Sequence, residues 1–145
     1  MGKILIIEDD LDMIEALKLV LEKRNYIVIT ALDPEEGLEK LKREKPDLLI
    51  LDVMFGSEQK TKGFDFAIKI RQDKELSKIP ILMITAVNFQ YPQFGFSPET
   101  DEEFLPVDDF IDKPVQPDQL INTVEKLLKQ KISKWVNWPE KNKDK

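Results

Sequence analysis

The sequence predicts an α/β fold in which a doubly wound, five-stranded parallel sheet carries helices on both faces. Short apolar runs such as 4–7 and 48–51 recur along the chain with polar residues at both ends, which is typical of strands buried on both faces. Segments with apolar residues at helical spacing separate these runs. Strands that alternate with helices in this way form a doubly wound sheet, and for five strands we expect the flavodoxin-like order 2-1-3-4-5.

Local signals mark where these elements begin and end. Asp33, Pro34 and Glu36 predict a helix start, because Asp33 can cap the helix, Pro34 fits its first turn and Glu36 closes a capping box. Pro46 ends that helix, and Gly63 opens the next one. In chain order we expect a strand at 4–7, a helix at 13–24, a strand at 26–30, a helix at 34–43, a strand at 48–51, a helix at 64–72, a strand that begins at 79–80, a strand at 109–112 and a helix from 117.

The segment from Ala86 to Val107 does not fit the alternating pattern. It holds three prolines and five aromatic residues, and a loop of this length without its own structure is uncommon in a compact domain. Ser97-Pro98-Glu99 predicts a short helix that ends near Phe104. The five aromatic side chains are expected to pack this segment onto the domain, with a partner-binding patch as the alternative.

Composition excludes several classes of function. A chain of 145 residues fits one domain, and its net charge of −6 argues against nucleic acid as a direct partner. The chain contains no cysteine and no histidine, so disulfides, thiolate metal sites and a phosphohistidine within this chain are excluded. No apolar run approaches the ~20 residues of a membrane span, and because the first predicted strand begins at once, we expect no signal peptide. The expectation is a soluble, cytoplasmic protein without a membrane partner.

Polar side chains follow four of the predicted strands. Glu8 and Asp9 follow the first strand, Asp52 the third, Thr85 the fourth and Lys113 the fifth. Because ligands of parallel sheets bind outside the carboxyl ends of the strands, these side chains should converge on one cleft. Neighbouring carboxylates repel each other by roughly 1 kcal/mol per pair in water and ~4 kcal/mol at an effective dielectric of 20. A cation would relieve this repulsion, and oxygen ligands favour Mg²⁺ or a similar hard ion such as Mn²⁺. A carboxylate held beside it could attack a phosphoryl group.

The chain resembles the receiver domain of two-component response regulators, of the stand-alone, single-domain type. The resemblance covers about residues 3 to 131. Each motif is weak evidence alone, but the four together, in this order and at strand ends, are strong evidence for the resemblance. The motifs are Ile6-Ile7-Glu8-Asp9-Asp10, Leu51-Asp52-Val53-Met54, Ile84-Thr85-Ala86 and Phe110-Ile111-Asp112-Lys113-Pro114.

The resemblance implies a role for each residue of the acidic cluster. Asp52 would be the phosphoacceptor and would also contact the metal. Asp9 would ligate Mg²⁺ directly, Glu8 would act through a water molecule, and the backbone carbonyl of Met54 would be a further ligand. Asp10 is expected only to start a helix.

The resemblance also assigns the residues around the phosphoryl group. Thr85 would hydrogen-bond a phosphoryl oxygen and move with it, and Lys113 would pair with Asp52 and then with the phosphate. A cis peptide before Pro114 would aim Lys113. Phe110 stands where the family keeps its aromatic switch residue, and without a hydroxyl its burial must distinguish the two states.

Two segments depart from the family pattern. The loop between Asp52 and Gly63 is about three residues longer than usual, and the segment between Thr85 and Lys113 is about six residues longer. The longer segment lacks the run that usually forms the fourth helix, so we expect that region to be altered. In the family this region belongs to the output surface, so the mode of signalling is the part that transfers least.

Structural interpretations stand beside the functional ones. Acidic residues after a strand often only offset a helix dipole, Asp52 alone could be a solvated strand end, and Phe110 could be plain core. Residues 1–131 are expected to form the receiver domain and 132–145 a C-terminal tail, partly ordered or disordered. In that tail Trp135 and Trp138 either cover the base of the last helix or fray.

The leading function is a phosphoacceptor switch rather than an enzyme. A sensor histidine kinase or a phosphotransfer protein would supply the phosphoryl group, and an unknown downstream protein would receive the signal. One alternative is a degenerate receiver that works as an adaptor without phosphorylation. Another is a Mg²⁺-dependent phosphatase, although Met54 stands where such enzymes often carry a second acid.

Overall fold

A computed structural model describes residues 2–52, 62–85 and 107–130 of the chain. The predicted helix at 97–104, the altered fourth-helix region and the C-terminal tail lie outside these ranges. The elements, in chain order, are β1 (Lys3–Ile7), α1 (Leu11–Glu22), β2 (Ile27–Ala31), α2 (Pro34–Glu44), β3 (Leu48–Asp52), α3 (Lys62–Arg71), a 3-10 turn (Leu76–Lys78), β4 (Ile81–Thr85), β5 (Asp109–Asp112) and α4 (Pro117–Gln130).

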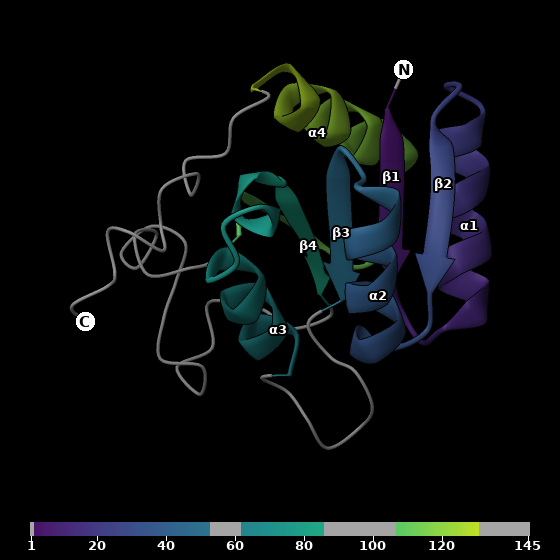
Figure 1. The fold of residues 1–145 in the computed structure, drawn as a ribbon. Coiled ribbons are helices and arrows are strands. Elements are labelled where there is room, and N and C mark those ends of the chain that lie inside the picture. Colours follow the sequence, from purple (N-terminus) through teal and green to yellow (C-terminus); the bar gives the residue numbers. More distant parts are fainter. Residues whose placement is uncertain (1, 53–61, 86–106, 131–145) are drawn as a thin grey trace, which may run out of the picture.

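The five strands form one parallel sheet in the order β2-β1-β3-β4-β5 (Figure 1). This confirms the predicted doubly wound α/β fold and its strand order. Successive side chains of a strand point to opposite faces, so each strand contributes to two cores. Leu5 and Ile7 pack in one cluster with residues of α2 and α3. Ile4 and Ile6 pack in the other with residues of α1 and α4.

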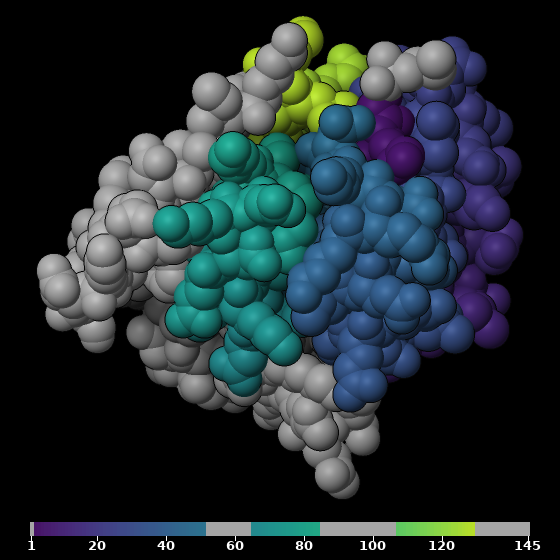
Figure 2. Space-filling model, viewed as in Figure 1, coloured from purple at the N-terminus to yellow at the C-terminus, as the bar shows by residue number. Residues whose placement is uncertain are grey.

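The two clusters define three layers. Helices α2 and α3 cover one face of the sheet, and their side chains fill much of the surface seen in Figure 2. Helices α1 and α4 cover the opposite face. Every strand of this parallel sheet ends at the same edge, which we call the carboxyl edge. The edge at which the strands begin is called the amino edge.

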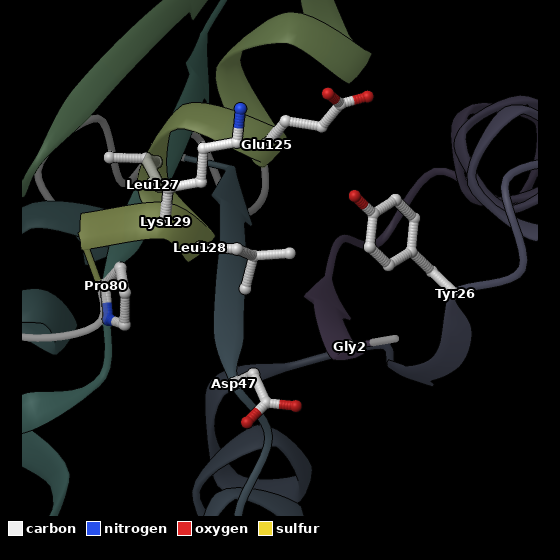
Figure 3. A pocket seen from close by; sticks show the side chains of 8 residues that line it. All are labelled: Gly2, Tyr26, Asp47, Pro80, Glu125, Leu127, Leu128 and Lys129. Atoms are coloured by element: carbon white, nitrogen blue, oxygen red, sulfur yellow. The ribbon is translucent and has the colours of Figure 1, made fainter.

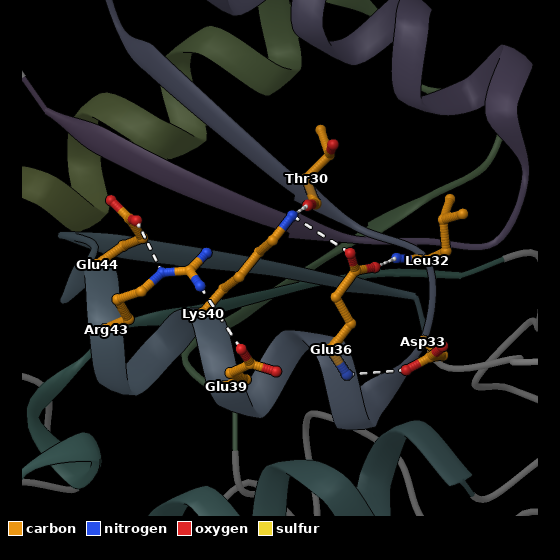
Figure 4. A network of polar contacts seen from close by, with 8 residues as sticks. All are labelled: Thr30, Leu32, Asp33, Glu36, Glu39, Lys40, Arg43 and Glu44. Atoms are coloured by element: carbon orange, nitrogen blue, oxygen red, sulfur yellow. Dashed lines mark hydrogen bonds and ion pairs between the residues drawn. The ribbon is translucent and has the colours of Figure 1, made fainter.

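The helix starts follow the chemistry that the sequence indicates. Asp10 caps α1, and its Oδ1 accepts hydrogen bonds from the N–H groups of Asp12 and Met13 at 3.0 and 3.3 Å. Asp33 caps α2 and accepts from the N–H of Glu36 at 2.8 Å. The Glu36 carboxylate accepts in return from a backbone N–H before the helix, a capping arrangement visible in Figure 4.

Helix α2 also protects the outer side of β2, the strand at one side of the sheet. Lys40 donates a hydrogen bond from Nζ to the carbonyl oxygen of Thr30 at 2.6 Å, and the same ammonium pairs with Glu36 at 3.4 Å (Figure 4). Thr30 lies on β2, which is an edge strand. A lysine over an edge strand blocks pairing with another chain, so this contact helps to keep the sheet at five strands.

Gly37 marks the closest approach of α2 to the sheet, and replacing it tests the packing of this layer. A Cβ atom at this position would lie 2.2 Å from Cδ1 and 2.8 Å from Cγ1 of Ile7, a fully buried side chain. We expect Gly37→Ala to lower the free energy of unfolding by about 1–3 kcal/mol through overpacking, although alanine is the better helix former by about 1 kcal/mol. Urea unfolding measures the change, and Lys42→Ala on the exposed face of α2 is the control. A Gly37→Ala protein as stable as the wild type would contradict this packing.

Candidate functional site

Glu8 is a buried carboxylate at the carboxyl edge. It directly follows β1, its side chain is 3 % exposed, and its N–H donates to the carbonyl oxygen of Ala31 at 3.0 Å. One carboxylate oxygen, Oε2, accepts a hydrogen bond from the N–H of Asp9 at 3.1 Å. The other, Oε1, lies 3.5 Å from Nζ of Lys113. A buried charge is costly unless it is paired, so these two contacts allow a charged carboxylate at this place.

Lys113 comes from the far side of the same edge. It directly follows β5, while Glu8 follows β1, and two strands of the sheet lie between them. The peptide bond between Lys113 and Pro114 is cis, the isomer that the resemblance implies. The ammonium therefore reaches across the ends of β3 and β4 toward Glu8, which brings two of the predicted site residues together.

The strand register places Asp52 and Thr85 between these two residues. Ile7 pairs with Leu51, so Glu8 and Asp52 each stand one residue beyond a matched pair on neighbouring strands. Neighbouring strands lie about 4.7–4.9 Å apart. On the next two strands Asp52 pairs with Ile84, and Thr85 pairs with Asp112. The backbones of all four predicted positions therefore end at one edge. The side chains of Asp52 and Thr85 and the whole of Met54 lie outside the described part.

The acidic residues near β1 have different environments. Asp9 is exposed at the carboxyl edge, whereas Asp10 is engaged as the cap of α1, as we expected of it. Among the side chains that the structure describes, no group of three or more ligating residues gathers around one point. The donor set that is described, Glu8 and Asp9, consists of carboxylate oxygens, the ligand type that hard cations such as Mg²⁺ prefer.

Phe110 lies on β5 and is partly buried. Its side chain packs against the cluster that includes Met83 and Val107. This contact is compatible with both interpretations of Phe110, as part of the core and as a switch that changes its burial.

A buried ion pair at the amino edge was missed by the sequence analysis. Arg71 ends α3 with its side chain fully buried, and its Nη2 lies 2.8 Å from Oδ2 of Asp108. The available signal was periodicity, because Arg71 stands four residues after Ala67 on the buried stripe of α3. Its partner, 37 residues away in sequence, could not be read from that pattern.

None of the described helices has both the length and the apolar character that crossing a lipid bilayer requires. The described elements form a sheet with an apolar cluster on each face, and the carboxyl edge of this sheet carries the contact between Glu8 and Lys113.

Comparisons with known proteins agree with this architecture. The family model of the response regulator receiver domain matches residues 4–125. The chain is 36% identical over 135 residues to the alkaline phosphatase synthesis transcriptional regulatory protein PhoP of Bacillus subtilis, a match that covers 88% of this chain and 49% of that protein. It is 33% identical over 128 residues to the probable transcriptional regulator ycf27 of Guillardia theta, with 88% and 46% covered. The chain thus spans about half the length of these curated relatives.

Solved structures share the fold. The N-terminal domain of a response regulator receiver protein from Methanoculleus marisnigri JR1 superimposes with a TM-score of 0.65 at 31% identity, over 87% of this chain and 95% of that one. The chemotaxis protein CheY4 of Vibrio cholerae superimposes with a TM-score of 0.72 at 26% identity, over 88% and 98%. With the family model matched over most of its length, the chain belongs to the response regulator receiver domain family of two-component systems.

Proposed function

We propose that this receiver domain is a phosphoacceptor switch in which Asp52 takes a phosphoryl group from a partner phosphohistidine. The observation that carries the proposal is the contact between buried Glu8 and Lys113 at 3.5 Å, at the edge where Asp52 ends β3. Two-component systems pair such domains with a histidine kinase, and receiver domains are typically non-enzymatic switches that generally bind Mg²⁺. A sensor kinase or a phosphotransfer protein is therefore the expected donor.

The residues would divide the work as follows. A carboxylate oxygen of Asp52 forms the new bond to phosphorus while the bond from phosphorus to the donor nitrogen breaks, and the nitrogen keeps the electron pair. Lys113 would stabilise the negative charge of the transferring group, and the Thr85 hydroxyl would donate to a phosphoryl oxygen. Glu8 and Asp9, with the Met54 carbonyl and Asp52, would hold Mg²⁺ or Mn²⁺. The bound metal would neutralise charge on the phosphoryl oxygens.

The proposed outcome of phosphorylation is a change in protein binding. Thr85 and Phe110 would transmit the change. Thr85 is the residue of β4 just beyond its pairing with β3, and Phe110 packs against the cluster that includes Met83, which is also on β4. The curated relatives described as transcriptional regulators are about twice as long as this chain. With a net charge of −6, we propose a protein rather than nucleic acid as the downstream partner.

The direct test is phosphoryl incorporation from acetyl phosphate with Mg²⁺, followed by intact-mass spectrometry. The wild type should gain one phosphoryl group and Asp52→Asn should gain none. Asp112→Asn is the matched control, because Asp112 is an exposed acid at the same edge and should leave incorporation intact. Incorporation that persists in Asp52→Asn would refute the assignment. Incorporation lost equally in Asp112→Asn would show that the assay reports general damage to the edge.

A further inference from the structure

The amino edge of the sheet, opposite the proposed phosphorylation site, carries a pocket of about 800 Å³. Four of its lining residues share one property, because each directly precedes a strand: Gly2, Tyr26, Asp47 and Pro80 precede β1, β2, β3 and β4. The pocket is therefore a product of the parallel topology, which gathers the strand starts in one place (Figure 3). Its size is within the usual range for pockets that hold bulky groups.

The last turns of α4 form the other wall. Leu127 and Leu128 line the pocket beside Glu125 and Lys129 (Figure 3). Leu128 reaches the opposite wall, since a Cβ placed on Gly2 would lie 3.2 Å from its Cδ1 and 3.5 Å from the Tyr26 ring. Burial and the Glu125 carboxylate raise the pKa of the Tyr26 phenol, so this ring is neutral at physiological pH. The apolar part of the lining is thus leucine, proline, glycine and a neutral aromatic ring, and its charged part is two carboxylates and the ammonium of Lys129.

We propose that this pocket is the docking site of the chain's own C-terminal segment, residues 131–145, with the indole rings of Trp135 and Trp138 as its anchors. The segment starts two residues beyond Lys129 of the pocket wall. Trp135 is six residues past Lys129, a span of up to ~20 Å when extended, which is enough for the chain to turn back over the pocket. The inference is independent of the proposed phosphorylation, since it concerns the opposite edge.

The composition of the segment fits the pocket in two ways. Both tryptophans of the chain lie in it, and large aromatic rings are effective anchors in apolar pockets. Residues 131–145 contain five lysines and two acids, for a net charge of +3, so residues 1–130 carry −9 of the total of −6. The carboxylates of Asp47 and Glu125 line the pocket. A cationic, tryptophan-bearing segment is therefore attached to an acidic domain, close in sequence to a wall of the pocket, and opposite charges favour its docking there.

Tryptophan fluorescence of the full chain tests this docking, because both tryptophans belong to the segment. The wild type should emit at shorter wavelength than a synthetic peptide of residues 131–145, and acrylamide should quench it less. Leu128→Glu should shift the emission and the quenching toward the values of the peptide. Leu19→Glu, at an exposed leucine of α1, should leave both at wild-type values, and circular dichroism should show folded protein in each case. Wild-type emission equal to that of the peptide would overturn the proposal.

Cross-linking gives a readout that does not depend on the folding of Leu128→Glu. The chain has no cysteine, so Glu125→Cys with Val136→Cys creates one possible disulfide between pocket wall and segment. Tethering gives an effective concentration in the millimolar range, roughly 100-fold above a protein concentration of about 10 µM, so an intramolecular bond should dominate. The control pair, Leu19→Cys with Val136→Cys, should cross-link far less. Equal yields for the two pairs, or a dimer that grows with protein concentration and so indicates a second copy as occupant, would overturn the proposal.

Discussion

Replacing Arg71 with methionine is expected to lower the free energy of unfolding by about 3–5 kcal/mol, because one partner of a buried ion pair is left uncompensated. Arg71 is fully buried and the side chain of Asp108 is 5% exposed. The guanidinium donates from Nη1 to the carbonyl oxygens of Ser77 and Ile79 at 3.0 and 2.8 Å. Burial lowers the pKa of Arg71 to about 10, with Asp108 acting in the opposite direction, so the group is charged at neutral pH.

The ion pair joins three parts of the fold. Arg71 ends α3, the two carbonyls belong to the turn before β4, and Asp108 directly precedes β5. Oδ2 of Asp108 also accepts the N–H of Ile81, the first residue of β4, at 2.8 Å. Losing the guanidinium removes the donor for two buried carbonyls and leaves a carboxylate without its charge partner. The cost should therefore exceed that of a methylene-sized change in the core.

Urea unfolding followed by circular dichroism at pH 7 measures the effect. A loss of this size corresponds to a fall in Tm of roughly 10–15 °C for a domain of this length. Arg24→Met is the matched control, since Arg24 pairs with Glu125 at 3.8 Å on the surface and exposed pairs contribute little. If Arg71→Met proves no more costly than Arg24→Met, the buried pair does not hold these elements together.

A double mutant measures the interaction energy between Arg71 and Asp108 apart from their other contacts. Arg71→Met with Asp108→Leu removes both charges, and buried pairs can often be replaced by apolar residues with little loss. The double mutant should therefore be more stable than the sum of the two single losses predicts, which gives a coupling energy in the range of about 0.5–3 kcal/mol. Strict additivity would place the energetic role in the carbonyl contacts of Arg71 instead of in its ion pair.

The fold was predictable because its determinants are local. Strands buried on both faces are written as apolar runs, and the expected strand at 109–112 agrees with β5. Helix ends were less well predicted, since they depend on contacts that the sequence does not state. Helix α2 ends at Glu44, one residue later than expected, with Lys45 in the left-handed conformation at φ 48°. Glycine usually occupies that conformation. Because a lysine stands here instead, no glycine in the sequence signals the end of the helix.

The carboxyl edge was predictable for a similar reason, because parallel strands must end together. The sequence could not show which charges meet there. Lys113 contacts Glu8, 105 residues away in sequence, and only the order of the sheet brings them together. The pocket at the amino edge was also beyond prediction, since one of its walls comes from single residues that precede strands and the other from the end of α4. Single residues at strand starts carry no periodic pattern.

Replacing Lys113 with alanine should change Mg²⁺ binding and phosphoryl transfer at the proposed site in opposite directions. The ammonium lies 3.5 Å from Oε1 of Glu8, where it competes with any cation that the acidic residues hold. Its removal should tighten Mg²⁺ binding by roughly tenfold, the equivalent of about 1.4 kcal/mol for one nearby charge in a partly screened site. Isothermal titration calorimetry with MgCl₂ measures this change.

Phosphoryl transfer should change in the opposite direction. If Lys113 stabilises the charge that develops on the transferring group, its loss should slow incorporation from acetyl phosphate by roughly 10²–10³-fold, as for other preorganised donors. Intact-mass spectrometry over time, at saturating Mg²⁺, gives the rate. Lys126→Ala is the control, because Lys126 pairs with Asp109 at the other end of β5 and should alter neither property.

The opposite signs make the experiment decisive for the role of Lys113. A purely structural role, in which the ammonium only compensates buried Glu8, predicts lower stability and weaker function without tighter metal binding, because the edge itself would be disturbed. A role in transfer predicts tighter binding of Mg²⁺ together with slower incorporation. Weaker Mg²⁺ binding in Lys113→Ala, with a normal circular dichroism spectrum, would contradict the proposed competition between the ammonium and the metal. Unchanged incorporation would contradict the assignment of Lys113 to the phosphoryl group.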